Sequence, residues 1–342
     1  MMIPEKCTTK DTPPKKRLKV MIFSGGGLRG YAIAKFMSYL DFDISKKVDV
    51  FSGTSIGGIL ALTYAINPHY GFISNTFRKF GNKIFAKKWY WKLPVLRWWH
   101  KVFKCPKYDD ANLKKMLYQF FGDRRLISIK NNFVIVVATN LSFECPQIFT
   151  NIQGSGIYGN EQSTLVNIGL YTAAAPIYFN AKSADIMTKM PKDMLEFFNL
   201  PKNTSFYWGD SIVIDGGLLE NIPVISTYVT AHQKWNLQPE DIDVLIIGTG
   251  KEHAFSTYSL KRINSWGIFG WLFKVIKPYL TESNEQTSIY WGEQMGFHSF
   301  RFFNPLVINA VMDDPKVLDE IDAQCELHKN KFISVINDFI NS

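Results

Sequence analysis

An α/β fold, with a mostly parallel central sheet flanked by helices, is predicted by two features of this 342-residue sequence. Near its start, two successive segments each run from an apolar strand through a glycine turn into a helix, and adjacent units of this kind imply parallel strands. Farther along, residues 244–247 are wholly apolar, as expected of a strand covered on both faces. The chain is 46% apolar and 20% charged, which favours a globular protein and excludes a disordered one.

The first strand is predicted over residues 18–23, and a glycine loop, SGGGLRG, and a helix over residues 31–40 follow it. Residues 1–17 are rich in Pro, Lys and Thr and are expected to form a flexible arm, so the folded domain is expected to span residues 18–342. The loop matches the GxGxxG pattern of dinucleotide-binding turns, with Asp49 as a candidate ribose ligand. A tight turn without a ligand is the simpler interpretation, because glycine is used wherever the backbone turns sharply.

The second unit carries a more specific motif. Residues 48–51 predict a strand and residues 59–66 an apolar helix, and Gly53-Thr-Ser-Ile-Gly57 between them matches the GxSxG nucleophile elbow. The glycines allow a strained turn that lifts the serine hydroxyl clear of the sheet, while the helix N-terminus faces developing negative charge. Ser55 is therefore the candidate nucleophile.

A serine nucleophile needs a base, and an acid at the end of a later strand is the preferred candidate. Residues 212–217, IVIDGG, place Asp215 at the edge of a sheet, although capping a turn is the simpler role for an Asp-Gly sequence. A further strand is predicted over residues 133–139, and helices are predicted over residues 110–121 and 317–340. A Ser-His-Asp triad stays open, because the order Ser55, Asp215 and then His253 or His298 occurs in α/β-hydrolases.

The three motifs SGGGLRG, GTSIGG and DGG, in this order, resemble those of the patatin-like phospholipases, lipid acyl hydrolases that use a Ser–Asp dyad without histidine. The resemblance extends over roughly residues 18–340 and includes residues 107–109, 173–179, 221–223, 248–250, 266–271 and 312–314. Ser24 is a departure from the plant patatins, which carry aspartate there, whereas lysophospholipase-type members carry serine.

This resemblance implies a patatin-like fold and hydrolysis of fatty-acyl esters by Ser55 and Asp215 through an acyl-enzyme, of phospholipase A or lysophospholipase type and without a cofactor. The glycine loop is expected to supply the oxyanion hole, through Gly25, Gly26, Gly27 and Arg29. The remaining motif glycines are Gly30, Gly53, Gly57, Gly216 and Gly217.

The net charge of +9 is concentrated in one stretch of the chain. Val50 to Tyr108 contains no acidic residue, and residues 74–108 are expected to form a basic and aromatic cap near the active site. Such a mixture suits contact with an anionic membrane surface and with phospholipid or another acyl lipid. Nucleic acid, the less favoured partner, could use the same chemistry, and a solvated helical cap is the simplest interpretation. The residues expected to contact a membrane are Lys87, Lys88, Trp89, Trp91, Lys92, Arg97, Trp98 and Trp99.

Several classes of site are disfavoured by what the sequence lacks. The four cysteines are far apart and form no CxxC pair, so no metal site and no disulfide framework is expected. No signal peptide or transmembrane run is recognisable, so a cytoplasmic protein with peripheral membrane association is expected. The alternatives to a Ser–Asp lipid hydrolase are an esterase with a Ser-His-Asp triad, a dinucleotide-binding oxidoreductase and a non-catalytic membrane-binding module.

Overall fold

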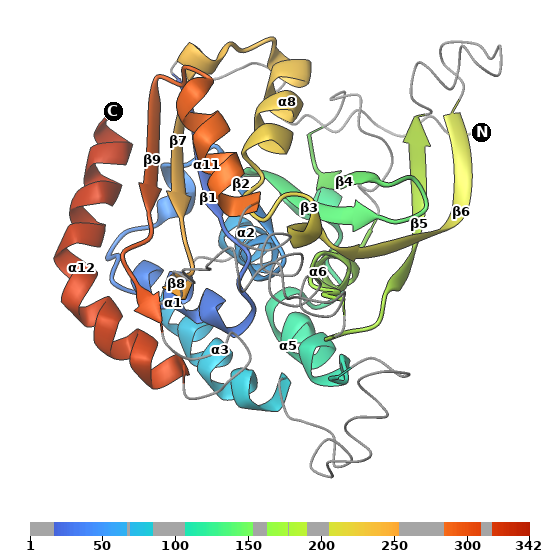
Figure 1. Ribbon diagram of the computed structural model, residues 1–342, viewed down its shortest axis with the longest axis horizontal. Helices are drawn as coiled ribbons and strands as arrows, with labels where there is room; N and C mark the ends of the chain where they lie inside the picture. Colours follow the sequence, from blue (N-terminus) through green and yellow to red (C-terminus); the bar gives the residue numbers. More distant parts are fainter. Residues whose placement is uncertain are drawn as a thin grey trace, which may run out of the picture.

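The computed structural model describes residues 17–66, 69–84, 107–152, 163–176, 178–189, 205–252, 284–308 and 317–342. Within these ranges the chain forms a central sheet of eight strands, in the order β5-β6-β3-β2-β1-β7-β9 with β4 paired to β3 (Figure 1). The strands are β1 (Leu18–Phe23), β2 (Val50–Thr54), β3 (Phe133–Asn140), β4 (Cys145–Thr150), β5 (Lys182–Lys189), β6 (Ser205–Asp215), β7 (Ile242–Ile247) and β9 (Ser299–Phe303). Two short strands, β8 (Lys251–Glu252) and β10 (Val307–Ile308), pair with each other outside this sheet.

Five neighbouring strands, β3, β2, β1, β7 and β9, run parallel, which confirms the predicted fold class. The remaining strands, β4, β5 and β6, pair in antiparallel fashion at the other end of the sheet. Figure 1 shows the long β5–β6 pair at one edge and β9 at the opposite edge. The motifs predicted that Asp215 ends a strand, but not that this strand, β6, pairs with its neighbours in antiparallel fashion.

Helices cover both faces of the sheet because its central strands are apolar on both sides. In β1, Met21 and Phe23 belong to one core, whereas Val20 and Ile22 belong to the other. The first core is completed by α1 (Tyr31–Met37), α2 (Ile56–Ile66), α3 (Tyr70–Ile84), α5 (Ala111–Phe121), α6 (Leu165–Thr172) and α12 (Val317–Asn341). The second is completed by α8 (Val224–Trp235), with α11 (Asn284–Gln294) packed against it. Within the described ranges, no helix has the length and apolar character needed to cross a membrane.

The predicted elements agree with the observed ones except at some of their ends. The second strand runs over Val50–Thr54, beyond the predicted 48–51, and the helix after it starts at Ile56, before the predicted 59. Residues 74–84, at the start of the expected cap, belong to α3, which packs into the core through buried Phe77 and Phe80. Most of the expected cap, residues 85–106, lies outside the described residues.

Candidate active site

Ser55 lies on a tight turn that joins β2 directly to α2. Its φ angle is 57°, in the left-handed region that side-chain-bearing residues avoid. The turn leaves no room for side chains at its glycines: a Cβ at Gly53 would lie 2.3 Å from the backbone of Gly57, and a Cβ at Gly57 would lie 2.2 Å from Phe23 O. The two glycines of the motif therefore permit the close packing that presents the Ser55 side chain.

The structure brings Asp215 next to Ser55, although 160 residues separate them in the sequence. Asp215 ends β6, where it lies opposite Ala138 of β3, and the adjacent Val137 pairs with Thr54 of β2. Asp215 therefore lies level with Ala138, one residue past the position that pairs with Thr54, and Thr54 is the residue before Ser55. Ser55 Oγ donates a hydrogen bond to Asp215 Oδ2 at 2.6 Å.

The second oxygen of the Asp215 carboxylate accepts a hydrogen bond from Gly217 N at 2.7 Å. Asp215 therefore both contacts the serine and caps the turn that follows β6. Burial raises the pKa of Asp215 to about 6, while the hydrogen bonds from Ser55 and Gly217 oppose the rise. A carboxylate with this pKa is ionised at neutral pH and is a stronger base than an exposed aspartate.

The glycine loop after β1 is fixed on two sides. Gly25 N donates to Asn221 O at 3.1 Å, in the segment that follows the DGG turn. Thr249, directly after β7, donates from its hydroxyl to Gly25 O at 2.9 Å, and its N–H donates to Ser24 Oγ at 3.1 Å. A Cβ at Gly25 would lie 3.4 Å from Ser55 Cβ, so the loop closely approaches the serine.

The four histidines in the described ranges make no hydrogen bond to Ser55 or Asp215 in the structure. His298 Nδ1 is 2.7 Å from Asp243 Oδ1, and His232 Nδ1 is 2.8 Å from Leu237 O. His253, one of the two triad candidates, lies outside the described residues. For His298 the triad arrangement is therefore absent.

Asp49 is not placed to bind a ribose on the glycine loop, so that prediction is wrong. It precedes β2 and accepts a hydrogen bond from Lys19 N at 2.8 Å, at the amino end of the parallel strands. The glycine loop follows the carboxyl end of β1, at the opposite edge of the sheet. The residues expected to contact a membrane, between Lys87 and Trp99, lie outside the described residues.

Two contacts at the site were not found from the sequence. Thr172, the last residue of α6, accepts a hydrogen bond from Ser55 N at 2.8 Å. Ala174 O accepts one from Asp215 N at 3.1 Å. For Ala174 the sequence signal was that residues 173–179 resemble a stretch of the patatin-like family, which gives that position no role, and no motif was recognised at Thr172.

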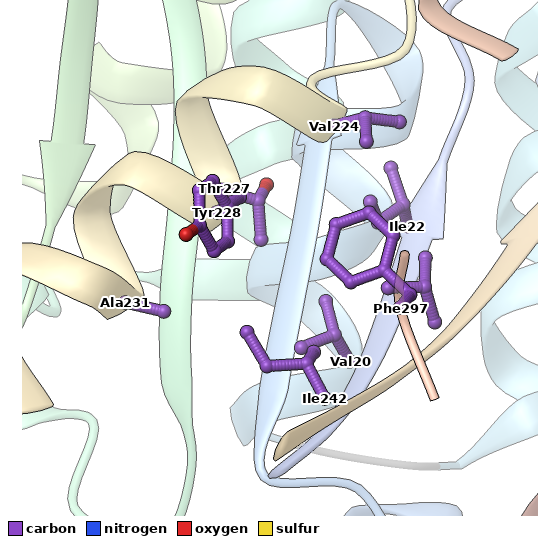
Figure 2. Close-up of a pocket in the computed structure, with 9 residues that line it drawn as sticks. Val20, Ile22, Val224, Thr227, Tyr228, Ala231, Ile242 and Phe297 are labelled. Carbon is purple, nitrogen blue, oxygen red and sulfur yellow. The ribbon is translucent and has the colours of Figure 1, made fainter. Parts of the chain in front are cut away.

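The cavity in Figure 2 lies away from these residues, between the central strands and α8. It is lined by apolar side chains that include Ile22, Ile242 and Phe297, and its volume is about 10 Å³. A cavity of this size has barely room for one water molecule, so it is a packing gap and not an acyl-chain site.

A serine on a strained strand-to-helix turn of an α/β sheet has the geometry of a nucleophile elbow. The chain belongs to the patatin-like phospholipase family, because the family model of that description matches residues 21–228, more than half of the chain. The resemblance seen in the sequence motifs is therefore confirmed, and it supports a lipid acyl hydrolase.

Two curated relatives agree with this assignment. The chain is 26% identical over 278 residues to the cGAMP-activated phospholipase of Vibrio cholerae, covering 75% of this chain and 71% of that protein. It is 27% identical over 325 residues to patatin-like protein 2 of Oryza sativa subsp. japonica, covering 84% and 76%. Among solved structures, human GIVD cytosolic phospholipase A2 in complex with methyl gamma-linolenyl fluorophosphonate is similar, with a TM-score of 0.43 and 8% identity over 95% of this chain and 59% of that one.

Proposed function

We propose that this chain is a serine acyl-ester hydrolase of lipids that uses Ser55 as nucleophile and Asp215 as base. The observation that supports the proposal most directly is the 2.6 Å hydrogen bond from Ser55 Oγ to Asp215 Oδ2 at the strained turn. A general base must lie within hydrogen-bond reach of the proton that it removes, and Asp215 meets that requirement. Its pKa of about 6 keeps it ionised at neutral pH.

The reaction proceeds in two steps. Ser55 Oγ attacks the ester carbonyl while Asp215 takes its proton, and collapse of the tetrahedral intermediate releases the alcohol, which leaves with that proton. Asp215 then removes a proton from water, which attacks the acyl-enzyme. As this second intermediate collapses and the fatty acid leaves, Asp215 returns the proton to Ser55 Oγ, so both residues regain their starting states. No cofactor takes part in either step.

The oxyanion of each tetrahedral intermediate requires hydrogen-bond donors beside Ser55. Of the four loop residues predicted for this role, Gly25 and Arg29 direct their backbone N–H groups to Asn221 O and Gly26 O. We therefore assign the oxyanion donors to the N–H groups of Gly26 and Gly27, with Gly25 and Arg29 shaping the loop.

Replacing either member of the dyad tests the mechanism. Ser55→Ala and Asp215→Asn should each remove nearly all hydrolysis of an acyl ester, with circular dichroism confirming that both variants fold. Single replacement of each of the six histidines is the matched control and should leave most of the activity. A folded histidine variant as inactive as Ser55→Ala would contradict the dyad and support a triad.

The substrate class is proposed to be a glycerophospholipid, a lysophospholipid or another acyl lipid. Lipid profiling after incubation with mixed phospholipid vesicles measures the activity and the substrate together. The assay should be run with and without cGAMP, because several relatives are named for activation by it. A wild-type protein that cleaves no acyl lipid in either condition and is not labelled by a fluorophosphonate would overturn the proposal.

Access to lipid is proposed to come from the basic and aromatic stretch between Phe85 and Tyr108. Lysines and arginines attract anionic headgroups, and tryptophans favour the membrane interface. The enzyme would then be associated peripherally with an anionic membrane.

A further inference from the structure

The turn at the end of α6 contacts the backbones of both dyad residues. Ser55 N donates to Thr172 Oγ1 at 2.8 Å, and Asp215 N donates to Ala174 O at 3.1 Å. These two acceptors are two residues apart, whereas one donor lies on the turn after β2 and the other at the end of β6. A single short segment therefore contacts the backbones of both the proposed nucleophile and the proposed base.

The Thr172 hydroxyl is itself held in place from the opposite side. It donates to Val137 O at 2.6 Å, and its residue is fully buried. Since a hydroxyl has a single hydrogen, the bond to Val137 directs its lone pairs toward Ser55 N. Val137 pairs with Thr54, the residue before the serine, so the hydroxyl connects α6, β3 and the turn at one point.

Ser55 needs such a contact because its own backbone conformation is unfavourable. A residue other than glycine in the left-handed region stores strain and persists when surrounding contacts hold it there. Ser55 O is held by Ile59 N within α2, and Ser55 N is held by Thr172. Loss of the threonine hydroxyl would leave the Ser55 N–H without this acceptor and remove one of the two contacts that hold the strained backbone.

We propose that Thr172 is a positioning residue for the reaction, whose hydroxyl fixes the strained backbone of Ser55 so that Oγ stays aligned with Asp215. This role rests on the proposed function of the dyad. Thr172 is fully buried and bonds to the backbone N–H of Ser55 and not to its reacting Oγ, so its effect is expected on the reactivity of Ser55 and not on the affinity for lipid.

The test compares Thr172→Val, which keeps the shape but loses the hydroxyl, with Thr172→Ser, which keeps the hydroxyl. Thr63→Val is the matched control, because Thr63 is a buried threonine of α2 whose Oγ1 donates to Ile59 O at 2.7 Å. For each variant, kcat and KM are measured on a short-chain soluble ester, together with the rate of labelling by a small fluorophosphonate and the unfolding temperature.

Thr172→Val is expected to lower both kcat and the labelling rate by about 10- to 100-fold, as a small misplacement of a reacting group does, with KM within about twofold of wild type. Thr172→Ser should restore most of both rates. Thr63→Val should lower the unfolding temperature without a matching loss of labelling, which separates positioning from stability.

A folded Thr172→Val protein with wild-type kcat and labelling would overturn the proposal, as would a folded Thr172→Ser protein as slow as Thr172→Val. If Thr172→Val does not fold, Thr172→Ala takes its place, because it removes the hydroxyl without adding an atom. The same two quantities, kcat and the labelling rate, then decide the outcome. A wild-type protein that neither hydrolyses the ester nor is labelled overturns the function itself, and the two failures are thereby distinguished.

Discussion

The Asp215 carboxylate is buried at the end of β6, and its pKa is raised to about 6 because burial disfavours the charged form. As a base it works only when ionised, and ionisation requires a higher pH than an exposed aspartate needs. We therefore expect kcat/KM for a soluble ester to be constant near pH 8 and to fall about tenfold per pH unit below about pH 6. A rate profile measured in constant ionic strength that stays flat to pH 4 would contradict this assignment of the base.

Gly26 is another residue whose replacement should slow the chemistry. A Cβ there would lie 2.2 Å from Thr249 Oγ1 and 2.7 Å from Thr249 Cβ, and Thr249 is buried and bonded to the loop. Because this β-branched side chain has little room to move, Gly26→Ala should displace the loop and misdirect its N–H donors. Turnover should fall about 10²- to 10³-fold, as on loss of an oxyanion donor.

The Gly26→Ala prediction is checked by steady-state kinetics alongside vesicle binding, which should change little. Gly71→Ala is the matched control, since a Cβ at that exposed helical position meets nothing within 4 Å. It should leave turnover unchanged and stabilise α3 slightly. Equal turnover in the Gly26→Ala and Gly71→Ala variants would show that the glycine loop takes no part in the mechanism.

At the scale of elements, Glu220 links α8 to β2, the strand that precedes Ser55. Its Oε1 accepts hydrogen bonds from Ile225 N at 2.8 Å and Ser226 N at 3.1 Å in the first turn of α8, and its Oε2 accepts one from Ser226 Oγ. Its backbone oxygen accepts a hydrogen bond from Thr54 Oγ1 at 2.8 Å. A buried carboxylate thus satisfies backbone donors at a helix start that would otherwise lack partners.

Glu220→Ala should therefore lower the free energy of unfolding by about 1–3 kcal/mol, because the buried N–H of Ser226 and the partly buried N–H of Ile225 lose their acceptor. Urea unfolding measures this loss, and Glu240→Ala, at an exposed position, is the control. Fluorophosphonate labelling of the folded variant should persist, since Glu220 has no part in the proposed chemistry. A Glu220→Ala variant as stable as wild type would show that these hydrogen bonds at the start of α8 do not contribute to stability.

The whole molecule carries a net charge of +9, and ten lysines and arginines lie in its acid-free stretch. Each such charge near an anionic surface contributes about 1 kcal/mol to binding, a contribution that salt screens. We expect the triple change of Lys87, Lys88 and Lys92 to Glu to weaken binding to anionic vesicles and to slow hydrolysis of vesicle lipid. Hydrolysis of a soluble short-chain ester should be unaffected.

Vesicle co-sedimentation at low and high salt measures this binding. The matched control changes Lys46, Lys47 and Lys331 to Glu, three exposed lysines elsewhere, and so alters the net charge equally. If both triple variants bind alike, net charge and not the stretch governs binding. If wild type does not bind at low salt, the membrane contact is made elsewhere or is absent.

Local pattern was sufficient to predict several elements and the motif residues. β1 was predicted with its observed ends, because a largely apolar run that follows a basic segment and leads into a glycine loop is typical of a short buried strand. Antiparallel β5 and β6 were harder to predict, since their pairing joins distant segments of mixed composition. The prediction that Asp49 binds a ribose was wrong because spacing in the sequence does not indicate at which edge of the sheet a residue lies.

The sequence by itself determined the parallel α/β core, the strained serine turn and the family, because each depends on short runs of apolar residues and glycines whose conformational demands are local. Only the tertiary structure decided that Ser55 and Asp215 share a hydrogen bond and that the N–H groups of Gly25 and Arg29 donate to backbone carbonyls. It alone also decided that the Thr172 hydroxyl accepts a hydrogen bond from Ser55 N. Hydrogen bonds of this kind depend on ångström-scale distances between segments far apart in the chain, and strand register and helix packing set those distances.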